Sequence, residues 1–340
     1  MAIYPGDYNS LRSARLRKIL YSVAVGAVVG VVAAVGYVWV RHRGANAPQE
    51  LPPSPPGTVV KAEAGGPAAA EPNVVSRVVN PAVVTEPNHA MAGPIAAAMS
   101  LLNQQPPRII EARDRLNEIL PMVQGQERAF VKEQLAALSD KWLFSKLVYP
   151  EDKLCAGYKV GSGDVLENVG KKYNVPYEIL MQINNIAKPE SLQAGVMIKV
   201  INGPFHARVW RSTFTMDLYL QNTYVRSFPV GLGKPGMETP TGRWRAKEGG
   251  KLIQPVWTDP VSGKTYHPED PDYPLGSRWV GLEGLEGAAV GKKGFAIHGT
   301  KSPEQIGTPG SQGCIRLHNG DAILVYNLMM PGVSLVDVVD

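Results

Sequence analysis

The sequence is poor in cysteine: it has two, Cys155 and Cys314, among 340 residues. So few cysteines exclude a disulfide framework, and each thiol needs its own explanation. Charge is also modest, because charged residues make up 19% of the chain and the net charge of +5 comes without a visible basic stripe. We therefore expect no nucleic-acid partner.

Charge is missing altogether from residues 19–40, "ILYSVAVGAVVGVVAAVGYVWV". This run is long enough to cross a hydrocarbon core roughly 30 Å thick, and it exceeds the roughly 7–15 apolar residues of a signal-peptide core. Basic residues are more numerous before it, at positions 12–18, than after it, at positions 41–43. The positive-inside rule predicts a single-pass anchor in the cell (inner) membrane, with residues 1–18 in the cytoplasm and everything after the run outside.

Two segments without a motif follow the predicted anchor. Proline and alanine dominate residues 41–89, which lack the periodicity needed to bury a core, so we expect a disordered, semi-stiff linker. Residues 90–150 carry apolar side chains at helical spacing, as in "PRIIEARDRLNEIL", and predict two or three antiparallel helices. We favour a small helical spacer over a docking module, and the sequence names no partner for it.

Residues 157–202 are too few for an enzyme domain and hold no reactive pair of side chains. Their order is strand, helix, helix, strand, with Asp164 in the turn "GSGD" placed to cap the first helix and Pro176 opening the second. The stretches "YKVGSGD", "YNVPYEILMQIN" and "LQAGVMIKV" resemble a LysM domain. The resemblance implies binding to peptidoglycan glycan strands, and a compact connector between neighbouring domains is the alternative.

The last segment, residues 203–340, is predicted to be mostly β. Apolar side chains alternate in "FTMDLYL", which predicts a half-buried strand, and further strands are expected at 223–230, in "GFAIHG" and at 333–339. A short helix is expected at about 321–330. The glycine-rich "GLGKPG" is not a phosphate loop, because no helix start and no GK[ST] follow it.

Four interpretations compete for Cys314, which lies in the polar stretch "SQGCIRL". A buried structural cysteine is common, but these neighbours are not apolar. A disulfide with Cys155 would have to link two predicted domains. A zinc ion could use His298, Cys314 and His318, but a fourth ligand is missing. A nucleophile needs a base within reach, which His298 could supply, so the residues alone indicate a cysteine acyltransferase or peptidase.

The motif "FAIHGT", with Cys314 sixteen positions after His298, resembles the catalytic domain of the L,D-transpeptidase family. Supporting matches are "FPVGLGKPGMETPTGRWRA", "PLGSRWVGLEG" and "PGVSLVDVV". The resemblance implies a small β-sandwich or flattened barrel. The expected fold class is thus a mostly β catalytic domain preceded by a small α+β LysM-like domain, a helical spacer and one transmembrane helix.

The resemblance also implies roles for single residues. Cys314 is the nucleophile, and His298 accepts and returns its proton. The imidazole is oriented by the backbone carbonyl of Gly299 or by the side chain of Ser311. Neither a metal nor a cofactor is expected.

Around the nucleophile, the resemblance assigns the oxyanion hole to the backbone N–H groups of Gly313 and Cys314. Arg316 organises the site or holds a substrate carboxylate, with a structural salt bridge as the alternative. Gln312 stands where many family members carry histidine, and it cannot take a proton. The insert at residues 247–281 is either a lid over the substrate or a packed loop.

The implied reaction joins peptidoglycan stem peptides. Cys314 forms an acyl-enzyme with a tetrapeptide stem, releases D-Ala and passes the acyl group to an amine of a neighbouring stem, which gives a 3→3 cross-link. A protein amine as acceptor would attach a protein, and water would make the enzyme an L,D-carboxypeptidase. A non-catalytic wall-binding protein is the alternative from a different class. The expected partners are stem peptides, glycan strands and, through residues 19–40, the membrane.

Overall fold

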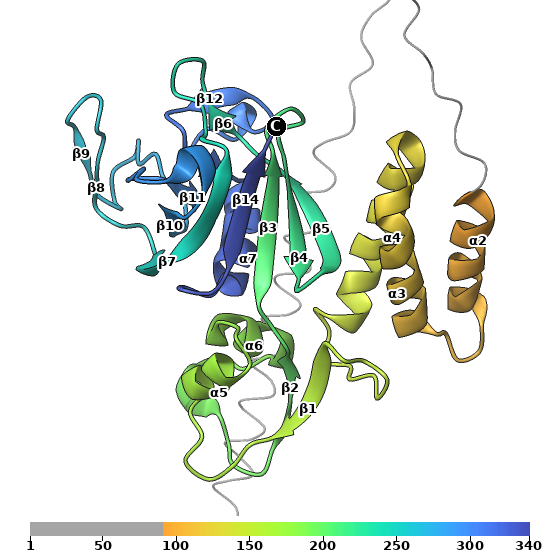
Figure 1. Ribbon diagram of the computed structural model, residues 1–340. Helices are drawn as coiled ribbons and strands as arrows, with labels where there is room; N and C mark the ends of the chain where they lie inside the picture. The colour runs from red at the N-terminus through yellow and green to blue at the C-terminus, as the bar shows by residue number, and fades with distance from the viewer. Residues whose placement is uncertain (1–90) are drawn as a thin grey trace, which may run out of the picture. The chain divides into compact units, whose positions relative to one another are not determined.

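The computed structural model describes residues 91–340, which are coloured in Figure 1. The predicted cytoplasmic tail, the anchor at 19–40 and the linker at 41–89 lie outside the described residues. Within residues 91–340, no helix has both the length and the apolar character that crossing a bilayer requires.

The first described segment is a group of helices. They are α2 (Ala92–Ser100), η2 (Leu101–Asn103), α3 (Ile109–Ile119), η3 (Leu120–Met122) and α4 (Gly125–Trp142). On α3 the predicted apolar face is buried, with Ala112 and Leu116 fully inaccessible. On α4, the apolar spacing of Phe130, Leu135 and Leu138 predicts an inner face, but Phe130 is 41% exposed and the neighbouring Val131 is buried in its place, together with Leu135.

The second segment folds as strand, helix, helix, strand. Its elements are β1 (Cys155–Lys159), α5 (Leu166–Lys172), α6 (Tyr177–Asn184), η4 (Pro189–Ser191) and β2 (Met197–Ile201). The two strands pair antiparallel. Asp164 does not cap α5 as expected: its carboxylate accepts hydrogen bonds from Gly161 N and Tyr158 Oη, both at 2.7 Å, so it closes the turn before the helix.

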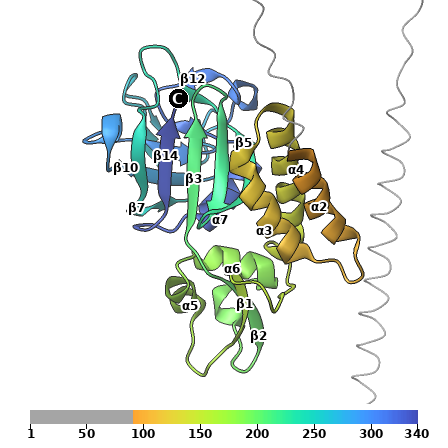
Figure 2. The ribbon, with the colours of Figure 1, turned by 45° about the vertical axis from the view of Figure 1, so that its right-hand side comes forward.

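An eight-stranded sheet forms the core of the third segment, and the expected mostly β domain is confirmed. Its strands are β3 (Phe205–Trp210), β4 (Thr215–Leu220), β5 (Thr223–Pro229), β7 (Gly242–Leu252), β10 (Trp279–Gly284), β11 (Ala296–His298), β13 (Ile315–Arg316) and β14 (Leu335–Val339). They lie in the order β13-β11-β10-β7-β14-β3-β4-β5, and the central strands can be followed in Figure 2. The pairs β3–β14 and β11–β13 are parallel, and the others are antiparallel.

Shorter elements complete this domain. They are β6 (Leu232–Gly233), β8 (Trp257–Thr258), β9 (Thr265–Tyr266), η5 (Gly287–Ala289), η6 (Pro303–Gln305), β12 (Pro309–Ser311) and α7 (Asn319–Leu328). β6 pairs with β12, and β8 pairs with β9. The β6–β12 pair ends at Ser311, three residues before Cys314, so it leads directly into the candidate motif.

The strand β4 departs from the half-buried pattern that its sequence predicts. Met216 and Leu218 are buried as expected, but Asp217 between them is also fully buried. Lys132 Nζ of α4 donates to both oxygens of this carboxylate, at 2.8 and 2.7 Å, and Trp210 Nε1 donates to it at 3.0 Å. The second face of β4 is therefore covered by the helical segment, which lies beside β5 in Figure 1.

The segment expected to be a spacer is thus bonded to its neighbours on both sides. Arg226 of β5 pairs with Asp140 of α4 at 2.5 Å. Lys199 of β2 donates through Nζ to the carbonyl oxygen of Ser145 at 3.0 Å, close after α4. These contacts fix the helical segment against the eight-stranded sheet and against the strand–helix–helix–strand segment.

Candidate active site

Two neighbouring strands bring the candidate nucleophile and base together. His298 is the last residue of β11, and Cys314 directly precedes β13, which pairs with β11 in parallel. In this register His298 lies opposite Arg316, and the N–H of Leu317 donates to the His298 carbonyl oxygen at 2.9 Å. The strand pairing therefore sets the spacing between the Cys314 and His298 backbones.

The imidazole of His298 is buried and held in one orientation. Nδ1 lies 2.6 Å from the carbonyl oxygen of Gly299. Because a carbonyl oxygen only accepts, Nδ1 carries the proton and Nε2 is left as the acceptor. The ring stacks on Trp279, with centroids 5.5 Å apart and planes at 20°. The sequence left Gly299 and Ser311 open as orienting groups, and this structure places Gly299 on the imidazole.

The thiol of Cys314 is only partly exposed and lies against backbone groups. Sγ is 3.6 Å from the carbonyl oxygen of Gly294, and the N–H of Ala296 points at the sulfur. Burial raises the pKa of the Cys314 thiol to about 11, against smaller lowering effects of the Ala296 N–H and the Arg316 charge. Burial, together with a smaller effect of the Arg316 charge, lowers the pKa of His298 to about 4, against the raising effects of hydrogen bonds to the backbones of Gly299 and Leu275. Near neutral pH the resting site therefore holds a protonated thiol and a neutral imidazole.

The loop before Cys314 is closed by its own serine. Ser311 Oγ donates to the carbonyl oxygen of Cys314 at 2.7 Å and accepts from the N–H of Gly313 at 3.0 Å. Gly313 has φ +110°, and a Cβ there would lie 2.6 Å from a ring carbon of Phe295. The loop therefore requires glycine at this position. The N–H of Gly313 is already occupied by a hydrogen bond to Ser311 Oγ in the same loop.

Arg316 supports the site through neutral partners. Its guanidinium donates to Gln305 Oε1 at 2.6 Å and to the carbonyl oxygen of Gly310 at 3.4 Å. Its backbone exchanges hydrogen bonds with Gly231 at 2.9 and 2.8 Å. Its hydrogen-bond partners within the described residues are therefore neutral, and the positive charge remains to act on His298 and Cys314.

Comparison with known families fits this geometry. Residues 204–338 match the family model of the L,D-transpeptidase catalytic domain, and residues 158–200 match that of the LysM domain. The chain carries an L,D-transpeptidase catalytic domain preceded by a LysM domain.

Similar proteins have been named in the same family. The chain is 29% identical over 188 residues to YkuD of Bacillus subtilis (strain 168), which is classed as an L,D-transpeptidase, and the match covers 52% of this chain and 96% of that protein. It is 27% identical over 193 residues to ErfK/SrfK of Escherichia coli (strain K12), also classed as an L,D-transpeptidase, with 52% of this chain and 53% of that protein covered.

Solved structures of the family are also found. An L,D-transpeptidase from Mycobacterium smegmatis is 19% identical, with a TM-score of 0.31 and 43% of this chain and 64% of that chain covered. The catalytic domain of the E. faecium L,D-transpeptidase is 18% identical, with a TM-score of 0.30 and 39% of this chain and 95% of that chain covered.

The insert of the transpeptidase domain reaches the catalytic motif. Its hairpin, β8–β9, stacks Trp257 on Tyr266 with centroids 6.0 Å apart. Asp259 at its turn accepts a hydrogen bond through Oδ1 from Gln312 Nε2 at 3.2 Å. Gln312 is two residues from Cys314, so the position where many family members carry histidine here binds the insert.

A cleft of about 630 Å³ adjoins the thiol. It is lined by Gly294, whose carbonyl contacts Cys314, by Trp279, which stacks on His298, and by Phe295. Lysine side chains also line it, namely Lys247, Lys292 and Lys293. Glu248 and Glu283 line it as well, so the cleft offers charged groups of both signs, with one more lysine than glutamate.

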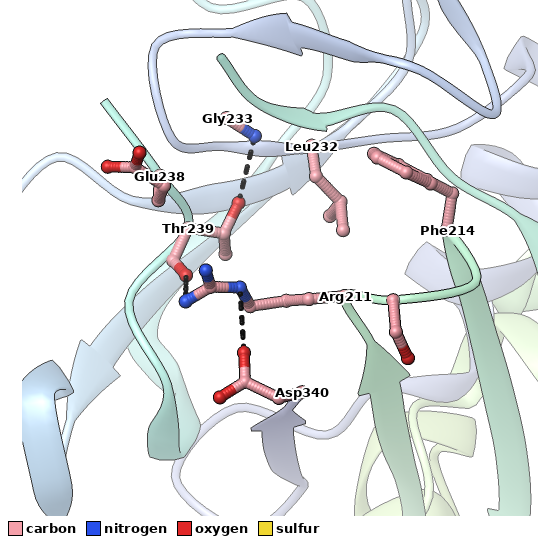
Figure 3. A pocket seen from close by; sticks show the side chains of 8 residues that line it. Arg211, Phe214, Leu232, Gly233, Glu238, Thr239 and Asp340 are labelled. Atoms are coloured by element: carbon pink, nitrogen blue, oxygen red, sulfur yellow. Dashed lines mark hydrogen bonds and ion pairs between the residues drawn. The ribbon is translucent and has the colours of Figure 1, made fainter. Parts of the chain in front are cut away.

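A second cavity, of about 240 Å³, is lined by residues that include Arg211, Gly233 and Thr239 and by neither cysteine nor histidine. Figure 3 shows Arg211 paired with Asp340 at 3.3 Å, and the N–H of Gly233 donating to Thr239 Oγ1 at 3.1 Å. Gly233 belongs to β6, the partner of β12, so this network supports the strand that carries Ser311.

The remaining sulfur and histidine candidates lie apart from this chemistry. Cys155 is buried at the start of β1, where burial raises the pKa of its thiol to about 12. Both cysteines are free thiols, so the disulfide considered above is not formed. His318 directly precedes α7. Across residues 91–340, no group of three or more histidine, cysteine or acidic side chains could hold a metal ion.

Two contacts of the site were not anticipated. Trp279 lies opposite His298 in the β10–β11 pairing and stacks on it, although the sequence offered it only as part of the insert. Asn319 bonds to the loop after His298. The only local signals were the stretches "SRWVGLEG" and "IRLHN", which do not reveal partners far away in the chain.

Proposed function

We propose that this protein is a membrane-anchored peptidoglycan L,D-transpeptidase. It cuts a tetrapeptide stem before its terminal D-Ala and joins the remaining acyl group to an amine of a neighbouring stem in a 3→3 cross-link. The observation that carries the proposal is the pair at the ends of neighbouring strands: the Cys314 thiol, and His298 with its Nδ1 on the Gly299 carbonyl.

In the first half-reaction, Cys314 Sγ attacks the carbonyl carbon of the third stem residue while its proton passes to Nε2 of His298. The N–H of Cys314 stabilises the oxyanion of the tetrahedral intermediate. The N–H of Gly313 can also donate to the oxyanion only if its hydrogen bond to Ser311 Oγ, at 3.0 Å, is broken. The carbon–nitrogen bond then breaks, His298 returns the proton to the leaving D-Ala amine, and a thioester remains on Cys314.

In the second half-reaction, the amine of a neighbouring stem attacks the thioester carbonyl. His298 takes the amine proton, the new amide forms, and Cys314 leaves as a thiolate that recovers the proton from His298. Water as acceptor gives an L,D-carboxypeptidase by the same steps, and a protein amine attaches a protein.

The surroundings of the site support a stem-peptide substrate. Stem peptides carry both carboxylates and amines, and the cleft that Gly294 and Phe295 line has three lysines, Lys247, Lys292 and Lys293, beside two glutamates, Glu248 and Glu283. The LysM domain supplies a second contact, to the glycan strand. The uncharged run at 19–40 supports a single-pass anchor with the catalytic domain on the extracytoplasmic side of the cell membrane.

Mass spectrometry of the full-length protein incubated with disaccharide-tetrapeptide tests the proposal. We expect loss of D-Ala and a cross-linked dimer, both absent with Cys314→Ser. Release of D-Ala without dimer would indicate the carboxypeptidase instead. If neither product forms while the protein still pellets with insoluble peptidoglycan, the protein is a wall-binding protein without this activity.

A further inference from the structure

Asn319, the first residue of α7, bonds to two loops at once. Its Oδ1 accepts from the N–H of Ser277 at 3.1 Å and from the N–H of Thr300 at 3.2 Å. Its Nδ2 donates to the carbonyl oxygen of Thr300 at 2.9 Å. Its own carbonyl oxygen accepts from Ser277 Oγ at 3.1 Å. Both ends of one exposed amide are therefore engaged with backbone groups from distant parts of the chain.

The two loops are shaped to receive this amide. A Cβ on Gly276 would lie 2.1 Å from Asn319 Oδ1, and a Cβ on Gly299 would lie 2.2 Å from it. Gly276 also has φ +65°, a conformation that favours glycine. Any side chain at either position would push the amide out, so the close approach depends on both glycines.

One of these loops controls the base. Thr300, which Asn319 holds from both sides, follows Gly299, whose carbonyl oxygen is the partner of His298 Nδ1 at 2.6 Å. At its other end, Asn319 continues the short segment that begins at Cys314. The amide thus ties the nucleophile's segment to the loop that orients the imidazole.

The bonds of Asn319 do not serve its own helix. α7 begins without a side-chain cap, and the residue before it is His318. A side chain needed only to start the helix would bond to the first turn of α7. Here every side-chain bond leads away from the helix, toward Ser277 and Thr300.

We propose that Asn319 is a positioning residue for the transpeptidase reaction. Its side-chain bonds go to the backbones of Ser277 and Thr300 and not to Cys314 or His298. It holds the Gly299–Thr300 loop so that the Gly299 carbonyl keeps the proton on Nδ1 and the Nε2 lone pair available to the Cys314 thiol. That the positioned base serves a transpeptidase reaction rests on the proposed function. The hydrogen bonds that position it do not.

Two substitutions in the full-length protein separate positioning from simple structural support. Asn319→Ala removes all the side-chain bonds, and we expect kcat for D-Ala release to fall on the order of 10²-fold with KM little changed, since misplacement of a base acts on the chemical step. Asn319→Asp keeps the acceptor for both N–H groups but sets a carboxylate oxygen against the Thr300 carbonyl. We expect it to retain part of kcat.

The pH profile gives a readout that a purely structural role would not move. Arg316 is the charged side chain that acts on the pKa of His298. A carboxylate added at position 319 favours the imidazolium, so the acid limb of kcat/KM in Asn319→Asp should move to higher pH. Asn327→Ala, on the same helix, is the matched control and should keep wild-type kinetics and profile.

Alkylation of Cys314 by iodoacetamide, followed by intact mass, makes the test independent of the substrate. If the wild type releases no D-Ala, the proposed function is wrong, and the alkylation rate and its pH profile still report the positioning. The inference is overturned if Asn319→Ala, with wild-type thermal stability, alkylates and turns over like the wild type. It is also overturned if Asn327→Ala loses as much kcat and alkylation rate as Asn319→Ala. The same holds if Asn319→Asp leaves the acid limb of the pH profile in place.

Discussion

Lys132 of the helical segment donates to both carboxylate oxygens of Asp217 in the catalytic sheet, at 2.8 and 2.7 Å, and Asp217 is fully buried. The aspartate lies on a strand of the transpeptidase domain, and its counter-ion comes from outside that domain. The transpeptidase domain therefore depends on the preceding helices to neutralise a charge in its own sheet.

Removal of this counter-ion should destabilise the protein strongly. Lys132→Met leaves the Asp217 carboxylate buried without its partner, and loss of one member of a buried pair costs about 3–5 kcal/mol. Urea unfolding of the full-length protein measures the change in the free energy of unfolding. Lys141→Met, an exposed lysine on the same helix, should change it by less than about 0.5 kcal/mol. Equal changes in the free energy of unfolding for the two variants would show that the Lys132–Asp217 pair does not stabilise the protein more than an exposed lysine does.

The pH dependence of acylation should reflect the lowered pKa of His298. The protonated imidazole cannot accept the thiol proton, so the rate is lost as the pH falls through the pKa of about 4. An unperturbed imidazole would lose it near about 6.5. The rate of acylation by a carbapenem, followed by intact mass between pH 3.5 and 8, gives this profile directly.

Arg316→Gln should move that profile in a known direction. The Arg316 charge lowers the pKa of His298, so its removal raises this pKa, and the acid limb moves toward higher pH. Arg211→Gln removes a guanidinium that is paired with Asp340 and is not among the groups that act on His298, so it should leave the limb in place. An unchanged limb in Arg316→Gln would contradict the assigned electrostatic effect.

The contact between Gln312 and Asp259 should affect substrate binding more than chemistry. Gln312→Ala releases the hairpin from the motif without removing a proton donor or acceptor of the reaction, so we expect KM to rise about 3- to 10-fold and kcat to stay within about twofold. Steady-state kinetics with disaccharide-tetrapeptide measures both.

Asp272→Ala is the control for this contact. It removes another carboxylate of the insert, whose partner is Lys264 at 2.7 Å and not the catalytic motif, and should leave KM unchanged. A fall in kcat with unchanged KM in Gln312→Ala would instead place Gln312 in the chemistry.

The elements that could be predicted from the sequence are those set by local pattern. The alternation in "FTMDLYL" predicts β4, and the helical spacing of Ala112 and Leu116 predicts the inner face of α3. Asp217 could not be predicted as buried, because its burial depends on a lysine 85 positions away. A strand pattern describes one chain segment and carries no information about what covers its outer face.

The same distinction holds in the active site. Cys314 and His298 were found from their motifs, since each motif is a short continuous stretch. The choice between Gly299 and Ser311 stayed open, because it depends on the path of the loop after β11, which the Asn319 amide holds. The anchor at 19–40 lies outside the described residues and remains a prediction from charge and length.

The central claim is that Cys314 becomes acylated by the stem peptide, and the mass of the acid-quenched full-length protein tests it most directly. After brief incubation with disaccharide-tetrapeptide, the wild type should carry one adduct with the mass of the substrate less D-Ala, mapped to the peptide that contains Cys314. Cys155→Ser should carry the same adduct, and Cys314→Ser none. An adduct that persists in Cys314→Ser, or one that maps to the Cys155 peptide, would contradict the account.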